Sequence, residues 1–242
     1  MFHIGIDEAG RGPAIGPLVV CALAMPESEK EILKSIGVKD SKKISRQKRE
    51  EIAERIYLEA EKRDWSIGII VCKASRIDVE RNKTDLNKLE VELFKEAIIA
   101  TGMKDVTGII QADACDVNEQ RFTDRISYSL GEDWDGWEIN AKHRMDSDEI
   151  LVGAASILAK VCRDKEIDEI SFLLDADIGS GYPSDPKTKD AVKKLVRNDL
   201  PNQYLRWSWA TVKNAWIKEH RKPIPIRQEL GEIGIQSSLN EW

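Results

Sequence analysis

The residues of this chain that could do chemistry are concentrated at its amino terminus. An apolar run over residues 2–6 predicts a β-strand, and two carboxylates, Asp7 and Glu8, follow it directly. A glycine-flanked arginine, Gly10-Arg11-Gly12, comes next, and glycines let the backbone approach a ligand closely. Acids at a strand end beside a flexible basic loop suit a metal-dependent site for a phosphate ligand, although a solvated acidic turn has the same pattern.

Two further acids occupy positions from which they could join this site. Asp113 ends another apolar run, and Asp146 precedes a long apolar segment. Mg²⁺ takes carboxylates, water and phosphates as ligands, and two such ions can activate a water and stabilise a leaving oxygen. Asp116 competes with Asp113 for the same role, as do Asp148 and Glu149 with Asp146, so the pattern leaves the third and fourth acids open.

Hydrophobic periodicity and turn residues predict the elements that must position these acids. The order of the elements is strands first, then strands alternating with helices, then helices, which favours an α/β fold with a mixed sheet and a helical C-terminal part. We expect strands over 2–6, 15–25, 65–74, 106–112 and 137–141, and helices over 27–35, 45–63, 85–100, 118–130, 150–174, 187–197 and 203–219.

Composition bounds the class of protein. The 242 residues are 41% hydrophobic, which is enough for one domain with a core, and no apolar run approaches the ~20 residues of a membrane span. No signal peptide is recognisable, and four widely spaced cysteines predict core thiols in a reducing cytoplasm. The net charge of −6 does not itself favour nucleic-acid binding, but basic clusters occur near residues 39–46, 142–144 and 187–194.

Five ordered motifs resemble the ribonuclease HII family (type 2 ribonuclease H), over about residues 2–216. They are Gly5-Ile6-Asp7-Glu8-Ala9-Gly10-Arg11-Gly12-Pro13 with Ile15-Gly16-Pro17, then Asp40-Ser41-Lys42-Lys43, Ala112-Asp113-Ala114, the run from Ala154 to Lys160, and the run from Gly179 to Pro186. The stretches 86–90 and 206–209 resemble the archaeal branch more than the bacterial one.

This resemblance implies a ribonuclease H-like mixed sheet flanked by helices. It implies a catalytic core over residues 1–174, a helical substrate-binding part over 175–220 and a flexible tail over 221–242. The implied activity is cleavage of RNA in RNA–DNA hybrids and 5′ of single ribonucleotides in duplex DNA, leaving 5′-phosphate and 3′-hydroxyl ends. The metal ligands, for Mg²⁺ or Mn²⁺, carry over onto Asp7, Glu8, Asp113 and Asp146.

The resemblance also assigns substrate contacts. Gly10-Arg11-Gly12 matches the loop that recognises ribose 2′-hydroxyls, the groups that distinguish RNA from DNA at a given site. Tyr182 matches a tyrosine that stacks on the sugar of the following deoxynucleotide. Candidate contacts to the duplex are Ser156, Lys42, Lys43 and Lys160, of which Lys160 could equally be a helix-surface lysine.

Three departures from the family pattern lie around the fourth acid. The stretch from Arg144 to Glu149 lacks the usual small residue before that acid and the usual apolar or proline-containing stretch after it, and Gly153 replaces a usual serine. Counting back from the Ala154 motif favours Asp146, with Asp148 as the rival. His143 is close enough in sequence to assist proton transfer or product release, although a polar loop histidine is the simpler interpretation.

The end of the chain resembles the short motif that docks onto sliding clamps. Gln236, Leu239 and Trp242 follow one another at intervals of three residues. On one helical turn, the apolar side chains of Leu239 and Trp242 would fit a hydrophobic groove of the clamp. The alternative is a disordered polar end with an incidental tryptophan.

Two other functions compete with the main one. A type 3 ribonuclease H would cleave only long hybrids, but the Gly10-Arg11-Gly12 loop and Tyr182 argue against it. A non-catalytic hybrid-binding subunit would not need all four acids. We further expect a cytoplasmic monomer with no membrane partner, acting in DNA replication and repair.

Overall fold

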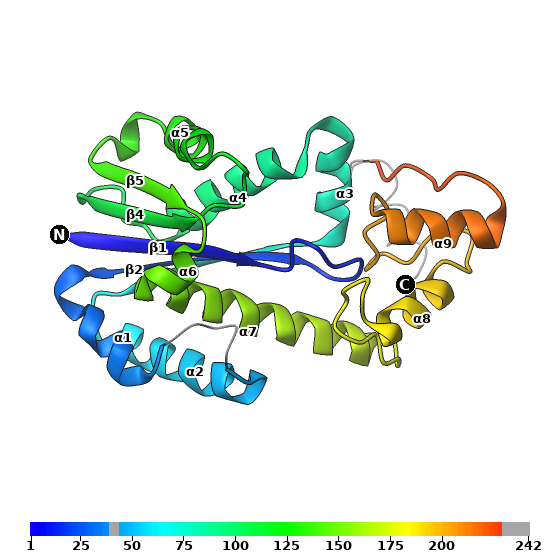
Figure 1. The fold of residues 1–242 in the computed structure, drawn as a ribbon, viewed down its shortest axis with the longest axis horizontal. Helices are drawn as coiled ribbons and strands as arrows, with labels where there is room; N and C mark the ends of the chain where they lie inside the picture. The colour runs from blue at the N-terminus through cyan, green and yellow to red at the C-terminus, as the bar shows by residue number, and fades with distance from the viewer. Residues whose placement is uncertain (39–43, 229–242) are drawn as a thin grey trace, which may run out of the picture. The chain divides into compact units, whose positions relative to one another are not determined.

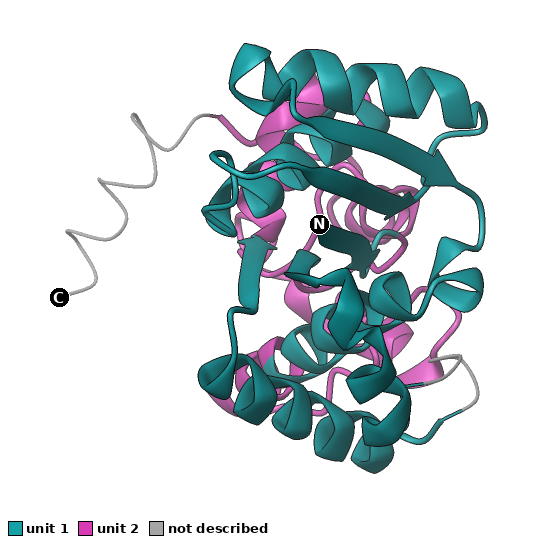
Figure 2. Cartoon of the chain, turned by 90° about the vertical axis from the view of Figure 1, so that its left-hand side faces the viewer, with its two compact units in different colours: residues 1–11, 18–72, 87–165 teal, residues 12–17, 73–86, 166–242 magenta. Residues whose placement is uncertain are grey.

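The computed structural model describes residues 1–38 and 44–228 of the chain, and it divides them into two compact units. Of the described residues, the first unit comprises 1–11, 18–38, 44–72 and 87–165, and the second comprises 12–17, 73–86 and 166–228 (Figure 2). Lys42, Lys43, Gln236, Leu239 and Trp242 lie outside the described residues. None of the described helices is long and apolar enough to cross a membrane.

The first unit is built on a mixed five-stranded sheet of order β3-β2-β1-β4-β5. The strands are β1 (Phe2–Ala9), β2 (Leu18–Pro26), β3 (Ser66–Cys72), β4 (Gly108–Asp113) and β5 (Trp137–Lys142). β1 pairs antiparallel with β2, and β2 pairs antiparallel with β3. On its other side β1 runs parallel to β4, and β4 runs parallel to β5, so β1, β4 and β5 end at the same edge.

Helices cover both faces of this sheet (Figure 1). The bounds in the first unit are α1 (Lys30–Ile36), α2 (Arg46–Lys62), α4 (Leu86–Ala100), α5 (Glu119–Leu130), α6 (Met145–Asp148) and the larger part of α7 (Ile150–Leu173). A Cβ at Gly5 would lie 2.5 Å from the backbone carbonyl carbon of Leu151, and one at Gly68 would lie 2.1 Å from the backbone oxygen of Ala97. Only glycine therefore lets α7 and α4 pack this closely on the sheet.

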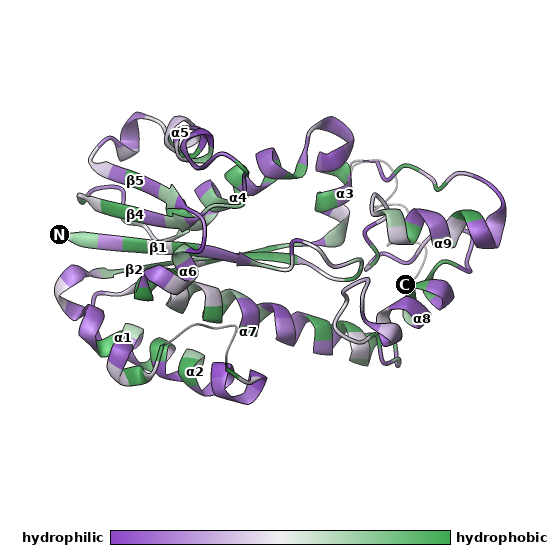
Figure 3. Cartoon of the chain, in the orientation of Figure 1, coloured by the Kyte–Doolittle hydropathy of each residue, from purple (hydrophilic) through white to green (hydrophobic). Residues whose placement is uncertain are grey.

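One core cluster of the first unit forms between β2 and the helices α1, α2 and α7. Every residue of β2 except Pro26 is buried, as expected for a central strand covered on both faces. The first half of α7 is almost wholly apolar and buried, whereas polar residues are interspersed along its second half (Figure 3). Its residues Leu151, Ala155 and Leu158 join this core. Ser45 caps α2 as predicted, its hydroxyl accepting the N–H of Lys48 at 3.2 Å.

The second unit has its own core and contains α3 (Ala74–Lys83), the C-terminal part of α7, α8 (Pro186–Leu195) and α9 (Ala210–His220). Its buried apolar residues include Ile15, Ile167, Val192, Leu205 and Trp216. The division at residues 174 and 220 made from the sequence stays a prediction.

The elements predicted from the sequence differ from the structure in several places. Residues 203–209, predicted as the start of a helix, are not helical, because the backbone of Tyr204 and Arg206 pairs with that of Gly16 and Ala14. The predicted strand over 65–74 ends at Cys72. The helix α3, which begins at Ala74, was not predicted. The predicted strand over 15–25 begins at Leu18, and the short helix α6 was also missed.

Candidate active site

Three aspartates meet at the edge where the parallel strands end. Asp7 lies near the end of β1, Asp113 is the last residue of β4, and Asp146 lies on α6. Each offers a carboxylate oxygen within 4.8 Å of the others. β1 and β4 pair in register, Ile6 opposite Ala112, and this pairing brings the next residue of each strand together. The structure thus unites three of the four acids singled out from the sequence.

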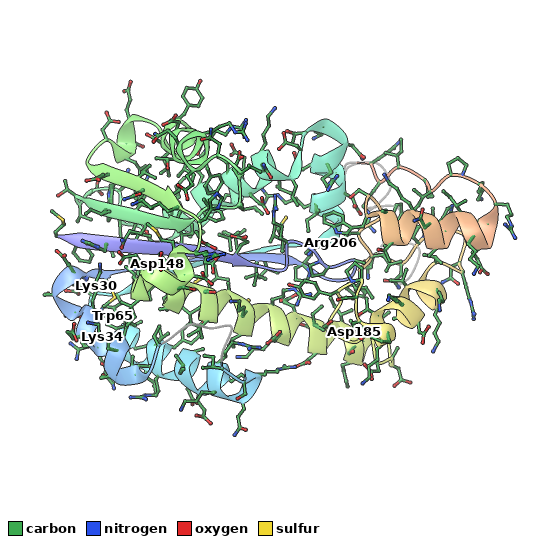
Figure 4. All side chains as sticks on the ribbon, viewed as in Figure 1. Lys30, Lys34, Trp65, Asp148, Asp185 and Arg206 are labelled. Atoms are coloured by element: carbon green, nitrogen blue, oxygen red, sulfur yellow. The ribbon has the colours of Figure 1, made fainter. Side chains whose placement is uncertain are left out.

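A contact between two segments places Asp146 in this cluster. An oxygen of Asp113, Oδ1, accepts the backbone N–H of Met145 at 2.8 Å. Arg144, which precedes α6, has a left-handed φ of 63°, a conformation that bulky residues rarely adopt and that is often found at functional sites. Asp146 is buried, whereas its rival Asp148, labelled in Figure 4, is exposed. The structure therefore gathers Asp146, rather than Asp148, with Asp7 and Asp113.

The other rival, Asp116, is engaged elsewhere. Its buried carboxylate accepts hydrogen bonds from both Arg121 (Nε, 3.0 Å) and Arg125 (3.3 Å). The hydrogen bonds from Arg121 lower the pKa of Asp116 to about 2. Asp116 thus has a structural role, holding the beginning of α5 to the segment that follows β4.

Glu8 lies next to the cluster rather than within the set of three. Burial raises the pKa of its carboxyl well above the ordinary range, and repulsion from Asp7, Glu90 and Asp113 adds to this. Its Oε2 is buried and has no hydrogen-bond partner among the described residues. An unpartnered carboxylate oxygen is costly unless a cation neutralises it, so the site fits a hard divalent ion with oxygen ligands.

Like Asp146, Asp7 is a buried ligand candidate. Burial raises its pKa to about 7, a hydrogen bond from Ser156 opposes the shift, and the charge of Asp113 adds to it. Ser156 is fully buried on α7, and its hydroxyl accepts a hydrogen bond from Nζ of Lys160 at 2.8 Å. Ser156 and Lys160 therefore lie beside the acid cluster, and their contacts with substrate stay a prediction.

His143 links the two chain segments that carry Asp113 and Asp146. Its Nδ1 lies 3.2 Å from the carbonyl oxygen of Ala114, and its backbone N–H donates to Glu119 at 2.7 Å. These contacts agree with a polar loop histidine that holds the segment after β4. Proton transfer by His143 stays a prediction.

The side chain of Arg11 is held by α4. Its Nε donates to Oε1 of Glu90 at 2.7 Å, and its Nη2 donates to Oδ1 of Asn87 at 2.6 Å. Glu90 is fully buried, although it belongs to a stretch noted in the sequence only for its resemblance. A glutamate beside the apolar positions of a helix is a signal that could have pointed to a buried charge partner, but it was not used in the sequence analysis.

Gly12 and Tyr182 lie together in the second unit. A Cβ at Gly12 would lie 3.6 Å from the Tyr182 ring, so Gly12 is in contact distance of the tyrosine. The backbone N–H of Ala14 donates to the carbonyl of Gly181 at 2.8 Å and ties the two segments together. Asp185, labelled in Figure 4, accepts from the backbone N–H groups of Ser180 (2.7 Å) and Lys187 (2.9 Å), which fixes the turn that carries Tyr182.

Known proteins resemble this chain over most of its length. The family model described as Ribonuclease HII matches residues 4–212. A Ribonuclease HII of Methanococcus maripaludis is 40% identical over 213 residues, which cover 87% of this chain and 85% of that protein.

Solved structures agree with this result. The ribonuclease H2 of Pyrococcus horikoshii superposes with a TM-score of 0.80 and 32% identity, covering 92% of this chain and all of that one. The PCNA:RNase HII complex from Archaeoglobus fulgidus gives a TM-score of 0.74 and 35% identity over 88% of this chain and 96% of that one. The expected fold class, a mixed α/β sheet flanked by helices, is confirmed. With its acid cluster on this fold and its match over residues 4–212, the chain belongs to the ribonuclease HII family, whose members are metal-dependent nucleases.

Proposed function

We propose that this enzyme hydrolyses the RNA strand of RNA–DNA hybrids and also cuts 5′ of single ribonucleotides embedded in duplex DNA. The products would carry 5′-phosphate and 3′-hydroxyl ends. One observation carries the proposal: Asp7, Asp113 and Asp146 converge within 4.8 Å, next to Glu8 and directly before the Gly10-Arg11-Gly12 loop in the chain. The residues of a site for divalent cations are thus followed in the chain by a loop whose backbone groups could hydrogen-bond a hydroxyl.

Four residues, Asp7, Glu8, Asp113 and Asp146, would hold two divalent ions, Mg²⁺ or Mn²⁺. When bound, such ions supply Lewis-acid activation of a water and charge stabilisation at the leaving oxygen. The chain's own part is to hold the carboxylates in place. Met145 fixes Asp113 through its backbone N–H, and Ser156, which contacts Lys160, hydrogen-bonds Asp7.

Selectivity for RNA would come from the loop and the tyrosine. Backbone N–H and C=O groups of Gly10, Arg11 and Gly12 would bond the 2′-hydroxyl, because no other group distinguishes RNA from DNA at one nucleotide. The side chain of Arg11 is engaged by Glu90 and Asn87, which favours reading by the loop backbone.

The remaining substrate contacts would position the duplex. Tyr182, which is 39% exposed, would stack on the sugar of the following deoxynucleotide. Lys160 would contact a phosphate without reading the base, as would Lys42 and Lys43, and Ser156 would support Lys160.

The chain would work as a monomeric cytoplasmic enzyme with a catalytic core (1–174), a helical substrate-binding part (175–220) and a tail (221–242). We propose that the tail docks onto a sliding clamp through Gln236, Leu239 and Trp242. The support is the similarity to an RNase HII that was solved as a complex with PCNA. Deletion of residues 236–242 should abolish clamp binding in a pull-down and leave cleavage of a short duplex unchanged; unchanged clamp binding would contradict this proposal.

The main proposal is tested with a duplex that carries one ribonucleotide, a long RNA–DNA hybrid and an all-DNA duplex of matched sequence. We expect Mg²⁺- or Mn²⁺-dependent cleavage of the first two, 5′ of the ribonucleotide in the first, and none of the third. Cleavage of the long hybrid alone would favour a type 3 activity. Absence of cleavage on both would favour a non-catalytic hybrid-binding protein.

A further inference from the structure

A segment predicted as helical, residues 204–209, instead runs alongside the loop that follows Arg11. Within the second unit, the N–H of Gly16 donates to the carbonyl of Tyr204 and the N–H of Arg206 donates to the carbonyl of Ala14, both at 2.9 Å. Ile15 and Leu205 form an antiparallel bridge between these two hydrogen bonds. The two segments are thus paired like short strands, about 190 residues apart in sequence.

The Arg206 side chain reinforces this pairing. Arg206, labelled in Figure 4, is fully buried, and its Nε donates to the carbonyl of Gly16 at 2.9 Å. Gly16 has a φ of +88°, so a glycine is required at this turn. The course of residues 12–16 is therefore set by backbone and side chain together.

Trp209 extends this arrangement to Gly12. The indole Nε1 of Trp209 donates to the carbonyl oxygen of Gly12 at 3.1 Å. The guanidinium carbons of Arg81 and Arg206 lie 5.0 and 4.9 Å from the centre of the Trp209 ring, close enough for cation–π attraction. These contacts restrict the ring, and the ring in turn restricts the peptide that follows Gly12.

A buried carboxylate anchors the turn that leads to Trp209. Asp78 of α3 is only 2% exposed, and it accepts the backbone N–H of Trp207 at 2.8 Å and that of Ser208 at 2.9 Å. The hydroxyl of Ser208 adds a third hydrogen bond of 2.7 Å. Because Asp78 binds the backbone N–H groups of both Trp207 and Ser208, the backbone that leads to Trp209 has little conformational freedom.

We propose that Trp209 is a positioning residue that presets the Gly12 end of the ribonucleotide-reading loop. This inference rests on the proposed function of that loop. A glycine loses more conformational entropy on ordering than any other residue, so fixing the carbonyl of Gly12 before substrate arrives reduces the cost of binding. The benefit is confined to substrates that use the loop, namely those with a 2′-hydroxyl.

The test compares Trp209→Phe with Trp207→Phe in the full-length enzyme. Both changes remove an indole N–H that donates to a backbone carbonyl at 3.1 Å, but the acceptor of Trp207 is Asn202, outside the loop. KM and kcat are measured on a duplex with one ribonucleotide, together with the inhibition constant of the all-DNA duplex. Loss of one net hydrogen bond predicts a rise in KM of about three- to tenfold for Trp209→Phe alone. We expect kcat and the inhibition constant to stay within about twofold, since neither depends on that one hydrogen bond.

A second variant guards against a merely structural effect. In Trp209→His, Nε2 occupies the same ring position relative to Cγ as the indole nitrogen. This variant can therefore restore the N–H donor that Trp209→Phe lacks, and its KM should lie between those of Trp209→Phe and the wild-type enzyme. Equal thermal unfolding midpoints of the two phenylalanine variants would show that stability is not the cause.

An unchanged KM, a parallel rise in the inhibition constant, or an equal effect of Trp207→Phe would each overturn the assignment. Failure of the wild-type enzyme to cut the single-ribonucleotide duplex would instead overturn the proposed function, and this inference with it.

Discussion

The carboxylate of Asp113 accepts a hydrogen bond of 2.8 Å from the backbone N–H of Met145, the residue directly before Asp146. One member of the acid cluster thereby fixes the segment that carries another. The same turn contains Arg144 with its left-handed φ of 63°, and α6 begins immediately after it. The geometry of the site therefore depends on a contact between the end of β4 and a turn 32 residues later.

The first prediction separates the two candidates for the fourth acid. Asp146→Asn should reduce cleavage by at least about 100-fold, because it removes a negative charge, and the proposed metal ligand, at the point where the acids converge. Asp148→Asn should retain wild-type activity, since Asp148 is exposed and lies outside the group of three. Initial rates on the single-ribonucleotide duplex measure both. An inactive Asp148→Asn enzyme beside an active Asp146→Asn enzyme would reverse the assignment.

The second prediction concerns the double role of Asp113. Asp113→Asn and Asp113→Ala should both inactivate the enzyme, because each removes the carboxylate charge. Only the alanine variant also loses the acceptor for the N–H of Met145, which should make it less stable than the asparagine variant by about 1 kcal/mol. Urea unfolding of the two metal-free variants measures the difference. Equal stabilities would mean that the hydrogen bond does not hold the turn.

The third prediction links metal binding to pH. Burial raises the pKa of Asp7 to about 7, so the folded, metal-free protein keeps a proton there that an unfolded chain would release. The stability contributed by this proton is present at acidic pH and is lost as the pH rises through about 7. A metal ion binds the carboxylate form, so binding below that pH must release protons.

Calorimetric titrations with Mg²⁺, in two buffers of different ionisation enthalpy, count the protons released. We expect release at pH 6 and little at pH 8.5, and an apparent affinity that rises over this interval. Asp7→Asn serves as the control and should remove the contribution of this group. A pH-independent affinity of the wild-type protein would contradict the prediction.

The fourth prediction tests the support of Asp7 by Ser156. Ser156→Ala removes a hydrogen bond that lowers the pKa of Asp7 and also removes the hydroxyl that accepts a hydrogen bond from Lys160. We expect the Mg²⁺ concentration for half-maximal activity to rise about tenfold, as for other residues that orient a ligand. Ser129→Ala is the matched control, because its hydroxyl donates to a backbone carbonyl of its own helix α5, that of Ile126. Identical metal dependence in the two variants would rule out this role.

The fifth prediction explains why a glycine precedes the Ala154 motif. A Cβ at Gly153 would lie 2.8 Å from the backbone oxygen of Asp146, so Gly153→Ala must displace the acid or the helix. We expect a loss of cleavage of about tenfold. Alanine is the better helix former, so wild-type activity with a higher unfolding midpoint would show that the turn adapts instead.

Sequence alone determined much of the fold and the nature of the site. Periodicity and turn residues located the five strands and most helices, and the residue types at the ends of β1 and β4 indicated a cation site. Ser45 was recognised as a cap because a capping hydroxyl acts on the N–H groups next to it in the chain. Such features depend on residues that are neighbours in the chain, so the sequence alone contains the information needed to predict them.

Only the tertiary structure decided which residues meet. Asp146, rather than Asp148, lies with Asp7 and Asp113, and Arg11 pairs with Glu90 across 79 residues. The segment 204–209 has a pattern compatible with a helix, but pairing with residues 14–16 satisfies its backbone instead. Periodicity shows which face of an element is buried, but the partner on that face is set by packing between segments distant in sequence.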